Sequence, residues 1–547
     1  MKRKFLIFII ILFVLSIYNL TAAAQSELAM SIRNHLIVIE EHAGEFPEGE
    51  DVRFYQELSE FYDQRHHRSI WFEDKEFKRD PDSLVKEIKN SYDEGLNPED
   101  YHLEYIEELI NEEKLFASES RGQRALLDIL LTNAYISLAS DYLNGKIDAE
   151  IIIDDDNYQA DSLEAQNLLE LLIEKNDISE TLQEQLPETE NYSKLKEKLA
   201  YYRDSNKVDD WSKIAAGEDL AEKAQGPRVE QLISNLNGRN YLNKANLKTD
   251  DYFDQNVKQA VVRFQIDYGL KPDGVVGKKT LEALNISRDQ RIKQLIINME
   301  RWRWLPEDLG SSYIYVNIAD YNLKLYEEKK VIMEMKTIVG QEQRSTPVFS
   351  DSIKYIVLNP YWYVPESIAV KDKLPEIKKD NNYLKENNYT LFEYSGNNKL
   401  EKVEPEDIEW SEINEDNFNY LLRQNPGDQN ALGRIKFMFP NKYSIYLHDT
   451  PGKNLFSETE RSFSSGCIRI ENPIDLAEYL LSDQEKWDRE SIESEMEKDK
   501  EKTVYLKNPI KIYLQYNTAW VDSLGNLNFR EDIYNRDQKI IEEYFNK

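Results

Sequence analysis

Cysteine is almost absent from this 547-residue chain, in which Cys467 is the single thiol. One cysteine excludes an intramolecular disulfide, so the fold cannot be stabilised by oxidation. Histidine is scarce too, because His448 is the one histidine that follows His102. A lone imidazole beside a lone thiol cannot complete a metal site by itself. The two can form a thiolate–imidazolium nucleophile, as cysteine acyl-transfer enzymes do.

Positive charge is in deficit throughout the chain. Its 69 basic residues stand against 102 acidic ones, which gives a formal net charge of −33. Binding to nucleic-acid phosphates is disfavoured by this balance, so we expect no nucleic-acid partner. The acidity by itself is typical of a soluble, well-solvated surface.

Long apolar runs are missing after the N-terminus. There, Lys2-Arg3-Lys4 precedes an apolar stretch from Phe5 to Leu15, and Ala22-Ala23-Ala24 follows. This order predicts a secretory signal over residues 1–24, cleaved after Ala24. The alternative is a retained N-terminal membrane anchor, because the stretch approaches the ~20 residues that span a bilayer. Both alternatives predict an exported protein of the periplasm or cell envelope.

The chain is long enough for several domains and its pattern predicts a multidomain α + β protein. Residues 26–225 have apolar positions at helical spacing and predict a helical scaffold domain. Residues 227–285 predict a small three-helix unit around a glycine-rich turn. β-branched and aromatic runs then predict a predominantly β domain over residues 310–541. A polar, acidic insertion at 371–432 interrupts it, and we expect either a lid over the site or a surface decoration.

The histidine and the cysteine lie in two short β-like segments. Tyr443 to His448 alternates as a strand, which predicts that Tyr446 and His448 share one face. The same argument puts Cys467 and Arg469 on one face of a second strand. A neighbouring imidazole is expected to convert the thiol to the thiolate. The alternative is a buried structural cysteine.

The residues before the cysteine suit a site for a carbonyl substrate. Gly466 lets the backbone approach a substrate closely, and amides around Ser465, Gly466 and Cys467 are candidates for an oxyanion hole. Arg469 is a candidate for binding a substrate carboxylate, with a structural ion pair as the alternative. Asp449 follows His448 directly and should point away from it. We therefore expect a backbone carbonyl to orient the imidazole.

Two segments resemble known families. The residues Ala260-Val261-Val262-Arg263-Phe264-Gln265, Gly269-Leu270, Asp273-Gly274, Gly277 and Thr280-Leu281 resemble small peptidoglycan-binding domains, although each could serve turn or core alone. His448 with Ser464-Ser465-Gly466-Cys467-Ile468-Arg469 is similar to the active-site motif of L,D-transpeptidases. Many members have a histidine at the position of Ser465, and the large multidomain exported branch matches this chain better.

More of the chain resembles that branch. The agreeing segments are Gly95-Leu96-Asn97-Pro98, Asp141-Tyr142-Leu143-Asn144-Gly145, Asn298 to Pro306, Asn359 to Pro365 and Thr518 to Asp522.

The resemblance implies a peptidoglycan L,D-transpeptidase that makes 3→3 cross-links. Cys467 would attack the third residue of a tetrapeptide stem and expel the terminal D-Ala, and an amine of a second stem would resolve the thioester. His448 would move the protons. Tyr446 and Trp362 are candidates for the walls of the donor pocket. The mechanism requires no metal and no diffusible cofactor. Hydrolysis by the same site, as an L,D-carboxypeptidase, and an inert wall-binding scaffold are the alternatives.

Overall fold

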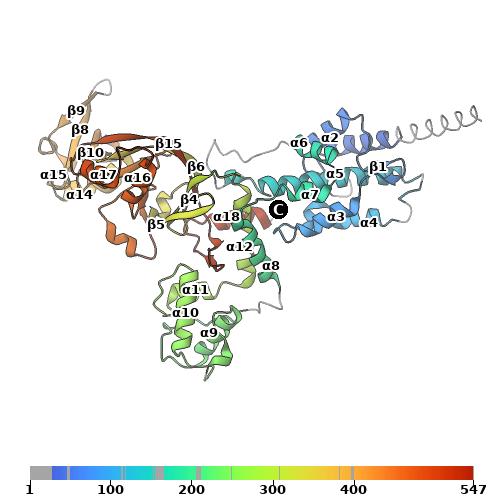
Figure 1. Ribbon diagram of the computed structural model, residues 1–547, viewed down its shortest axis with the longest axis horizontal. Helices are drawn as coiled ribbons and strands as arrows, with labels where there is room; N and C mark the ends of the chain where they lie inside the picture. Colours follow the sequence, from blue (N-terminus) through green and yellow to red (C-terminus); the bar gives the residue numbers. More distant parts are fainter. Residues whose placement is uncertain are drawn as a thin grey trace, which may run out of the picture.

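The computed structural model describes residues 27–45, 50–112, 115–117, 119–151, 153, 165–175, 177–204, 211–247, 249–306, 308–380, 382–395 and 399–545. The predicted signal segment, 1–24, lies outside them. Figure 1 shows a helical part at one end, a β-rich part at the other and a compact helical unit below. The chain thus has the multidomain α + β fold that the sequence predicts.

The helical part is built around one long buried helix. Most side chains of this helix, α5 (Arg121–Asn144), are buried on all of its faces, which shows that other elements surround it. The helical part also contains a helix at 27–41, α2 (Tyr55–Gln64), α3 (Pro81–Asn90), α4 (Leu103–Ile110), α6 (Ala165–Glu174), α7 (Ile178–Gln183) and the hairpin β1 (Phe72–Glu73) and β2 (Glu76–Phe77). Helix α8 (Glu190–Arg203) follows them and packs along the later helix at 288–303. Within the described ranges, no helix is both long and apolar enough to cross a bilayer.

The compact unit below contains α9 (Pro227–Gly238), α10 (Gln255–Asp267) and α11 (Lys278–Leu284). Its glycine-rich turn is held from the inside by Gln265, which is 1% exposed. The Gln265 side chain accepts from Gly274 N at 2.8 Å and donates to the Val275 carbonyl at 2.9 Å. Gln265 therefore has the architectural role that the sequence left open beside a binding role.

The β-rich part is one sheet that closes on itself. Its nine strands run in the order β13-β5-β14-β12-β11-β6-β15-β3-β4, and β4 also pairs with β5. The strands are β3 (Ser312–Asn317), β4 (Asn322–Glu327), β5 (Lys330–Gly340), β6 (Phe349–Leu358), β11 (Ile435–Met438), β12 (Leu447–His448), β13 (Ser462–Ser464), β14 (Ile468–Ile470) and β15 (Lys502–Gln515). Closure removes the exposed sheet edges on which chains aggregate. The helices α16 (Pro473–Leu481) and α17 (Arg489–Met496) and the hairpin β16 (Ala519–Val521) and β17 (Leu527–Phe529) accompany this sheet.

The insertion is a subdomain with a hydrophobic core of its own. That core gathers Trp362, Leu374, Ile377, Leu391, Trp410 and Leu422, among others. The subdomain has a four-stranded sheet in the order β7-β10-β8-β9. Its elements are β7 (Trp362–Tyr363), α13 (Glu366–Ile368), a π-helical turn (Ala369–Lys373), α14 (Leu374–Lys379), α15 (Tyr383–Glu386), β8 (Tyr389–Ser395), β9 (Lys399–Val403) and β10 (Tyr420–Gln424). Its ordered core starts before residue 371, because Trp362 and Val364 belong to it.

One helix, α12 (Arg288–Arg303), joins the helical and β-rich parts. Glu300 and Arg303 form an ion pair of 2.8 Å with both side chains fully buried. The Glu300 carboxylate accepts from Ile147 N at 3.0 Å, and Arg303 donates to the Glu94 carbonyl at 2.6 Å. Both charged groups thus also hydrogen-bond to the backbone of the helical part. A buried ion pair needs such additional hydrogen bonds to offset the cost of desolvation.

The other end of α12 holds the C-terminal segment. Asn298 accepts from Thr518 N at 2.9 Å, and Arg301 pairs at 2.6 Å with Asp537 of α18 (Arg536–Phe545). The Tyr544 hydroxyl of α18 donates to the Gly95 carbonyl at 3.2 Å. Four of the five segments that resemble multidomain L,D-transpeptidases outside the cysteine motif therefore meet at this joint, whereas Asn359 to Pro365 lies where the insertion begins.

Replacing Glu300 by glutamine should destabilise the chain by roughly 3–5 kcal/mol, because Arg303 is left as an uncompensated buried charge. Denaturant unfolding of the full chain measures the loss. A matched control is Glu107→Gln, which removes an exposed 2.7 Å pair with Lys89 and should change stability by less than about 1 kcal/mol. Equal effects of the two substitutions would contradict the structural role of the joint.

Candidate active site

The site is built where two short strands pair in parallel. Leu447 lies opposite Ile468 and His448 opposite Arg469, in strands β12 and β14. Ile468 N donates to the Tyr446 carbonyl at 3.1 Å, which continues the pairing toward Cys467. The structure thus brings together the thiol segment and the histidine segment.

The strand that carries His448 is shorter than the sequence predicts. Only Leu447–His448 pairs as β12, because Ser444 adopts a left-handed conformation with φ 56°. Asn441 holds this turn, since its side-chain carbonyl accepts from both Tyr443 N and Ile445 N at 3.1 Å. The turn aims the Ser444 carbonyl at the thiol, and the Cys467 Sγ lies 3.7 Å from it.

A row of three polar side chains crosses the sheet at His448. Lys436 of β11 is its register partner on one side, and Arg469 of β14 is its partner on the other. Residues directly opposite on paired strands project from the same face. The imidazole therefore lies between two cationic side chains. Sequence reasoning missed Lys436. Burial alternates along β11, so Ile435 and Phe437 face the core and Lys436 faces the other side of the sheet.

The thiol lies one row further along the same face. The Tyr446 hydroxyl and main-chain amide both hydrogen-bond to Cys467. The Tyr446 ring lies 5.7 Å from the His448 ring, and the Lys436 Nζ lies 3.7 Å from the Tyr446 ring centroid. Tyr446 also packs against the core of the β-rich part and the core of the insertion. It therefore forms a wall of the site, at the boundary between barrel and insertion.

A backbone carbonyl orients the imidazole, as the sequence predicts. His448 Nδ1 donates to the Asp449 carbonyl at 2.5 Å. The Asp449 side chain points elsewhere: it accepts from Arg434 N at 2.8 Å and pairs with Lys453 at 2.7 Å. Among the hydrogen bonds of the described residues, none joins His448 to Cys467. With Nδ1 carrying the proton, Nε2 is the nitrogen that can accept one.

Burial favours the neutral forms of both reactive groups, whereas the sequence predicts a thiolate–imidazolium pair. Burial raises the pKa of the Cys467 thiol, and Tyr446, Lys436 and Arg469 oppose that rise. Burial is also the main reason why the pKa of His448 falls to about 3, with the positive charge of Arg469 adding to it. The resting site thus holds a thiol and a neutral imidazole.

The backbone amide of Gly466, which the sequence suggests for an oxyanion hole, already has a hydrogen-bond partner. Gly466, at φ 113°, donates its amide to the Ser464 hydroxyl at 3.2 Å and accepts from Thr346 Oγ1 at 2.7 Å. Its amide is therefore occupied and is not free for an oxyanion. The Cys467 amide makes no hydrogen bond within the described part of the chain. Ser465 is exposed, and its hydroxyl accepts from Arg344 at 2.9 Å.

Trp362 lies in the hydrophobic core of the insertion. Its side chain is 8% exposed, with the Tyr389 ring 6.5 Å away and the Lys373 Nζ 5.6 Å from its centroid. Strand β7 pairs with β10, which directs Trp362 into that core. Tyr446 packs against the same core, and a role for Trp362 as a wall of the donor pocket stays a prediction.

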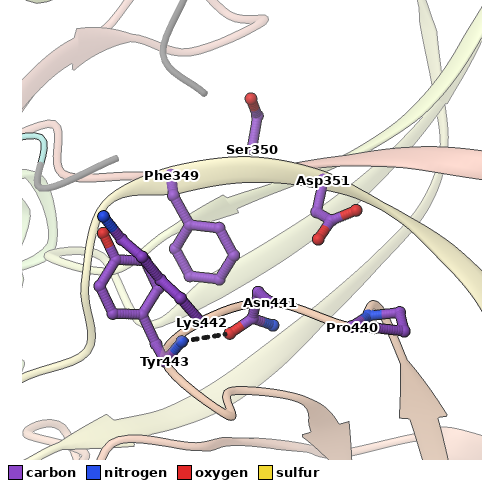
Figure 2. A pocket seen from close by; sticks show the side chains of 7 residues that line it. All are labelled: Phe349, Ser350, Asp351, Pro440, Asn441, Lys442 and Tyr443. Atoms are coloured by element: carbon purple, nitrogen blue, oxygen red, sulfur yellow. Dashed lines mark hydrogen bonds between the residues drawn. The ribbon is translucent and has the colours of Figure 1, made fainter. Parts of the chain in front are cut away.

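A cavity of about 350 Å³ lies beside the loop that leads to β12 (Figure 2). It is lined by Phe349, Ser350, Asp351, Pro440, Asn441, Lys442 and Tyr443. The Phe349 ring stands over the loop, and the dashed line in Figure 2 marks the bond from Tyr443 N to Asn441. Neither the thiol nor the imidazole lines this cavity. In the described ranges there is also no group of three or more His, Cys, Asp or Glu residues that could hold a metal ion.

Comparison with known proteins divides the chain into three matched regions. Residues 56–199 match a scaffold domain, and residues 225–284 match a family described as "Putative peptidoglycan binding domain". Residues 311–506 match the L,D-transpeptidase catalytic domain.

Individual proteins agree with this division. A curated Haemophilus influenzae protein named "Putative L,D-transpeptidase" is 35% identical over 268 residues, which are 48% of this chain and 53% of that protein. The chain thus spans about half the length of the curated relative it matches.

Two crystal structures of L,D-transpeptidases, from Xylanimonas cellulosilytica and Stackebrandtia nassauensis, are 14% and 12% identical and cover 55% of this chain. The matches include 99% and 95% of the two solved chains. Their TM-scores are 0.17 and 0.21, which are too low to support an argument. The family matches carry the identification. The β-rich part therefore contains an L,D-transpeptidase catalytic domain, which the chain combines with a region that matches a scaffold domain and one that matches a peptidoglycan-binding domain.

Proposed function

We propose that the protein is a peptidoglycan L,D-transpeptidase that forms 3→3 cross-links through a thioester on Cys467. The single observation that carries the proposal is the pairing of β12 with β14, which sets the chain's one thiol beside Tyr446 and near His448. An extracytoplasmic location follows from a substrate that is part of the cell wall.

The first half-reaction is acylation of the thiol. Cys467 Sγ attacks the carbonyl carbon of the third residue of a tetrapeptide stem. The Sγ–C bond forms, the C–N bond to the terminal D-Ala breaks, and the thiol proton passes through His448 Nε2 to the leaving amine. The Cys467 amide is the backbone donor placed to stabilise the oxyanion.

The second half-reaction transfers the acyl group. An amine of a second stem attacks the thioester carbon and gives its proton to His448, and the Sγ leaves and recovers a proton from the imidazole. Arg469 projects from the same face, which supports a role in binding a stem carboxylate. Water in place of the amine would give the carboxypeptidase reaction. The peptidoglycan-binding domain would raise the local concentration of stems.

Replacing Cys467 by alanine should abolish both D-Ala release and formation of cross-linked dimers, by a factor of about a thousand or more. Mass spectrometry of muropeptides incubated with the purified protein measures both products. The matched control is Ser457→Ala, an exposed hydroxyl in the same segment. Unchanged dimers with Cys467→Ala would refute the nucleophile. Tripeptides without dimers in the unmodified protein would establish hydrolysis instead.

The pH dependence of D-Ala release should lack a histidine limb near pH 6.5. Because the pKa of His448 is about 3, the imidazole stays neutral as the pH falls through that range. Because the pKa of Cys467 lies above its ordinary value, kcat/KM should still rise with pH above 8. Measuring kcat/KM between pH 4.5 and 9.5 tests this, since that ratio reports ionisations of the free enzyme. A bell-shaped profile with an acid limb between pH 6 and 7 would contradict it.

The insertion is proposed to act as a lid, because one ion pair links it to the thiol segment. Arg344 donates to both carboxylate oxygens of Asp372, at 2.5 and 2.9 Å, and to the Ser465 hydroxyl at 2.9 Å. Asp372 lies in the π-helical turn of the insertion. The bidentate geometry fixes the insertion against the residue two before the thiol.

Replacing Asp372 by asparagine should loosen the lid and admit water, which raises the ratio of tripeptide to dimer by roughly fivefold for a loss of about 1 kcal/mol. The control is Glu401→Gln, which removes an exposed 3.2 Å pair with Lys399 elsewhere in the insertion. A product ratio that changes equally in the two variants, or in neither, would rule out a lid held by this ion pair.

A further inference from the structure

Lys436 is the one residue of the polar row that neither the sequence motif nor the transfer chemistry accounts for. It lies on β11 between Ile435 and Phe437, whose side chains are fully buried in the core. Alternation therefore turns Lys436 to the opposite face, where it is the register partner of His448.

The Lys436 ammonium is held close to the thiol through an aromatic ring. Its Nζ lies 3.7 Å from the Tyr446 ring centroid, within the range of a cation–π contact. Tyr446 in turn hydrogen-bonds to Cys467 through its hydroxyl and its amide. The Tyr446 ring thus lies between the Lys436 ammonium and Cys467 Sγ.

Lys436 and Arg469 lack carboxylate partners, which is unusual for half-buried cations. Among the ion pairs and hydrogen bonds of the described residues, none involves either side chain, and the Arg469 Nε is buried without a partner. Burial lowers the pKa of both groups, and for both the charge of Cys467 is the strongest opposing influence. Unpaired buried cations are costly and persist where they serve a function.

We propose that Lys436 is a positioning residue for the nucleophile: with Arg469, its ammonium stabilises the negative charge that Cys467 carries once the thiol has given up its proton, a task the sequence motif assigns to the histidine. The inference rests on the proposed function, because it names the group that supports that thiol. His448 is neutral at rest between the two cations and holds a positive charge only while it carries the proton.

The charged groups that face the thiol are few enough to test one by one. Lys436 approaches from β11, His448 from β12, Tyr446 from just before β12, and Arg469 from β14. Arg344 lies behind Ser465 but is neutralised by Asp372. Further from the thiol, Glu501 acts on Lys436, while its carboxylate accepts from Tyr361 N at 3.0 Å.

The experiment measures the ionisation of the thiol in the full chain, without any peptidoglycan. The rate of Cys467 alkylation by iodoacetamide is followed between pH 6 and 10.5, and its midpoint gives the thiol pKa. Lys436→Met should move the midpoint up by about one pH unit, which means roughly tenfold less thiolate at neutral pH. Lys436→Arg keeps the charge and should restore most of the wild-type midpoint. Lys436→Gln, polar and uncharged, should match the methionine variant.

The matched control is Lys354→Met, which removes an exposed lysine from the neighbouring strand β6 and should leave the midpoint unchanged. His448→Gln should move it by less than Lys436→Met does. A midpoint of Lys436→Met and Lys436→Gln equal to that of the wild type would overturn the inference. A larger shift in His448→Gln would overturn it too. The readout needs no turnover, so a chain with these shifts but no dimer formation would refute the proposed function and leave the role of Lys436 standing.

Discussion

The parallel pairing of β12 with β14 is the constraint on which the site depends. Two strands of two and three residues bring His448 opposite Arg469, and they extend to set Tyr446 against Cys467. Such short strands cannot hold their register alone, because few hydrogen bonds offset the entropy of ordering them. The register is kept by the neighbours β11 and β5 within a closed sheet, so the barrel as a whole positions the thiol.

The joint at α12 explains much of the chain that lies far from the thiol. The buried Glu300–Arg303 pair connects the helical part to the β-rich part, and Asn298 and Arg301 tie in the C-terminal segment. Gly145 is required there, since an added Cβ would come 2.6 Å from the Glu300 carboxylate. Much of the resemblance outside the cysteine motif thus lies at the contacts between domains, whereas the reacting groups are confined to one face of the sheet.

The electrostatics of the site follow from burial more than from sequence neighbours. A thiol and an imidazole taken out of water both favour their neutral forms, and the two flanking cations then disfavour an imidazolium further. The nucleophile is therefore not stored as a charged pair. Negative charge appears on sulfur only when the thiol loses its proton, and attack then moves it to the carbonyl oxygen. Two positive side chains already lie beside the sulfur, so they favour the charged states along the reaction over the neutral resting state.

The sequence by itself determined the domain order, the β-rich character of the region after residue 310, and a thiol segment and a histidine segment that meet. These follow from composition, periodicity and the scarcity of cysteine and histidine, which are local properties. Tertiary structure decided the rest. Ser444 leaves the strand because a turn held by Asn441 intervenes, and Trp362 enters the insertion's core because β7 pairs with β10. The place of Lys436 beside His448 depends on strand register, and the neutral thiol depends on burial. Strand register and burial cannot be deduced from a short stretch of sequence, because both arise only when distant segments pack together.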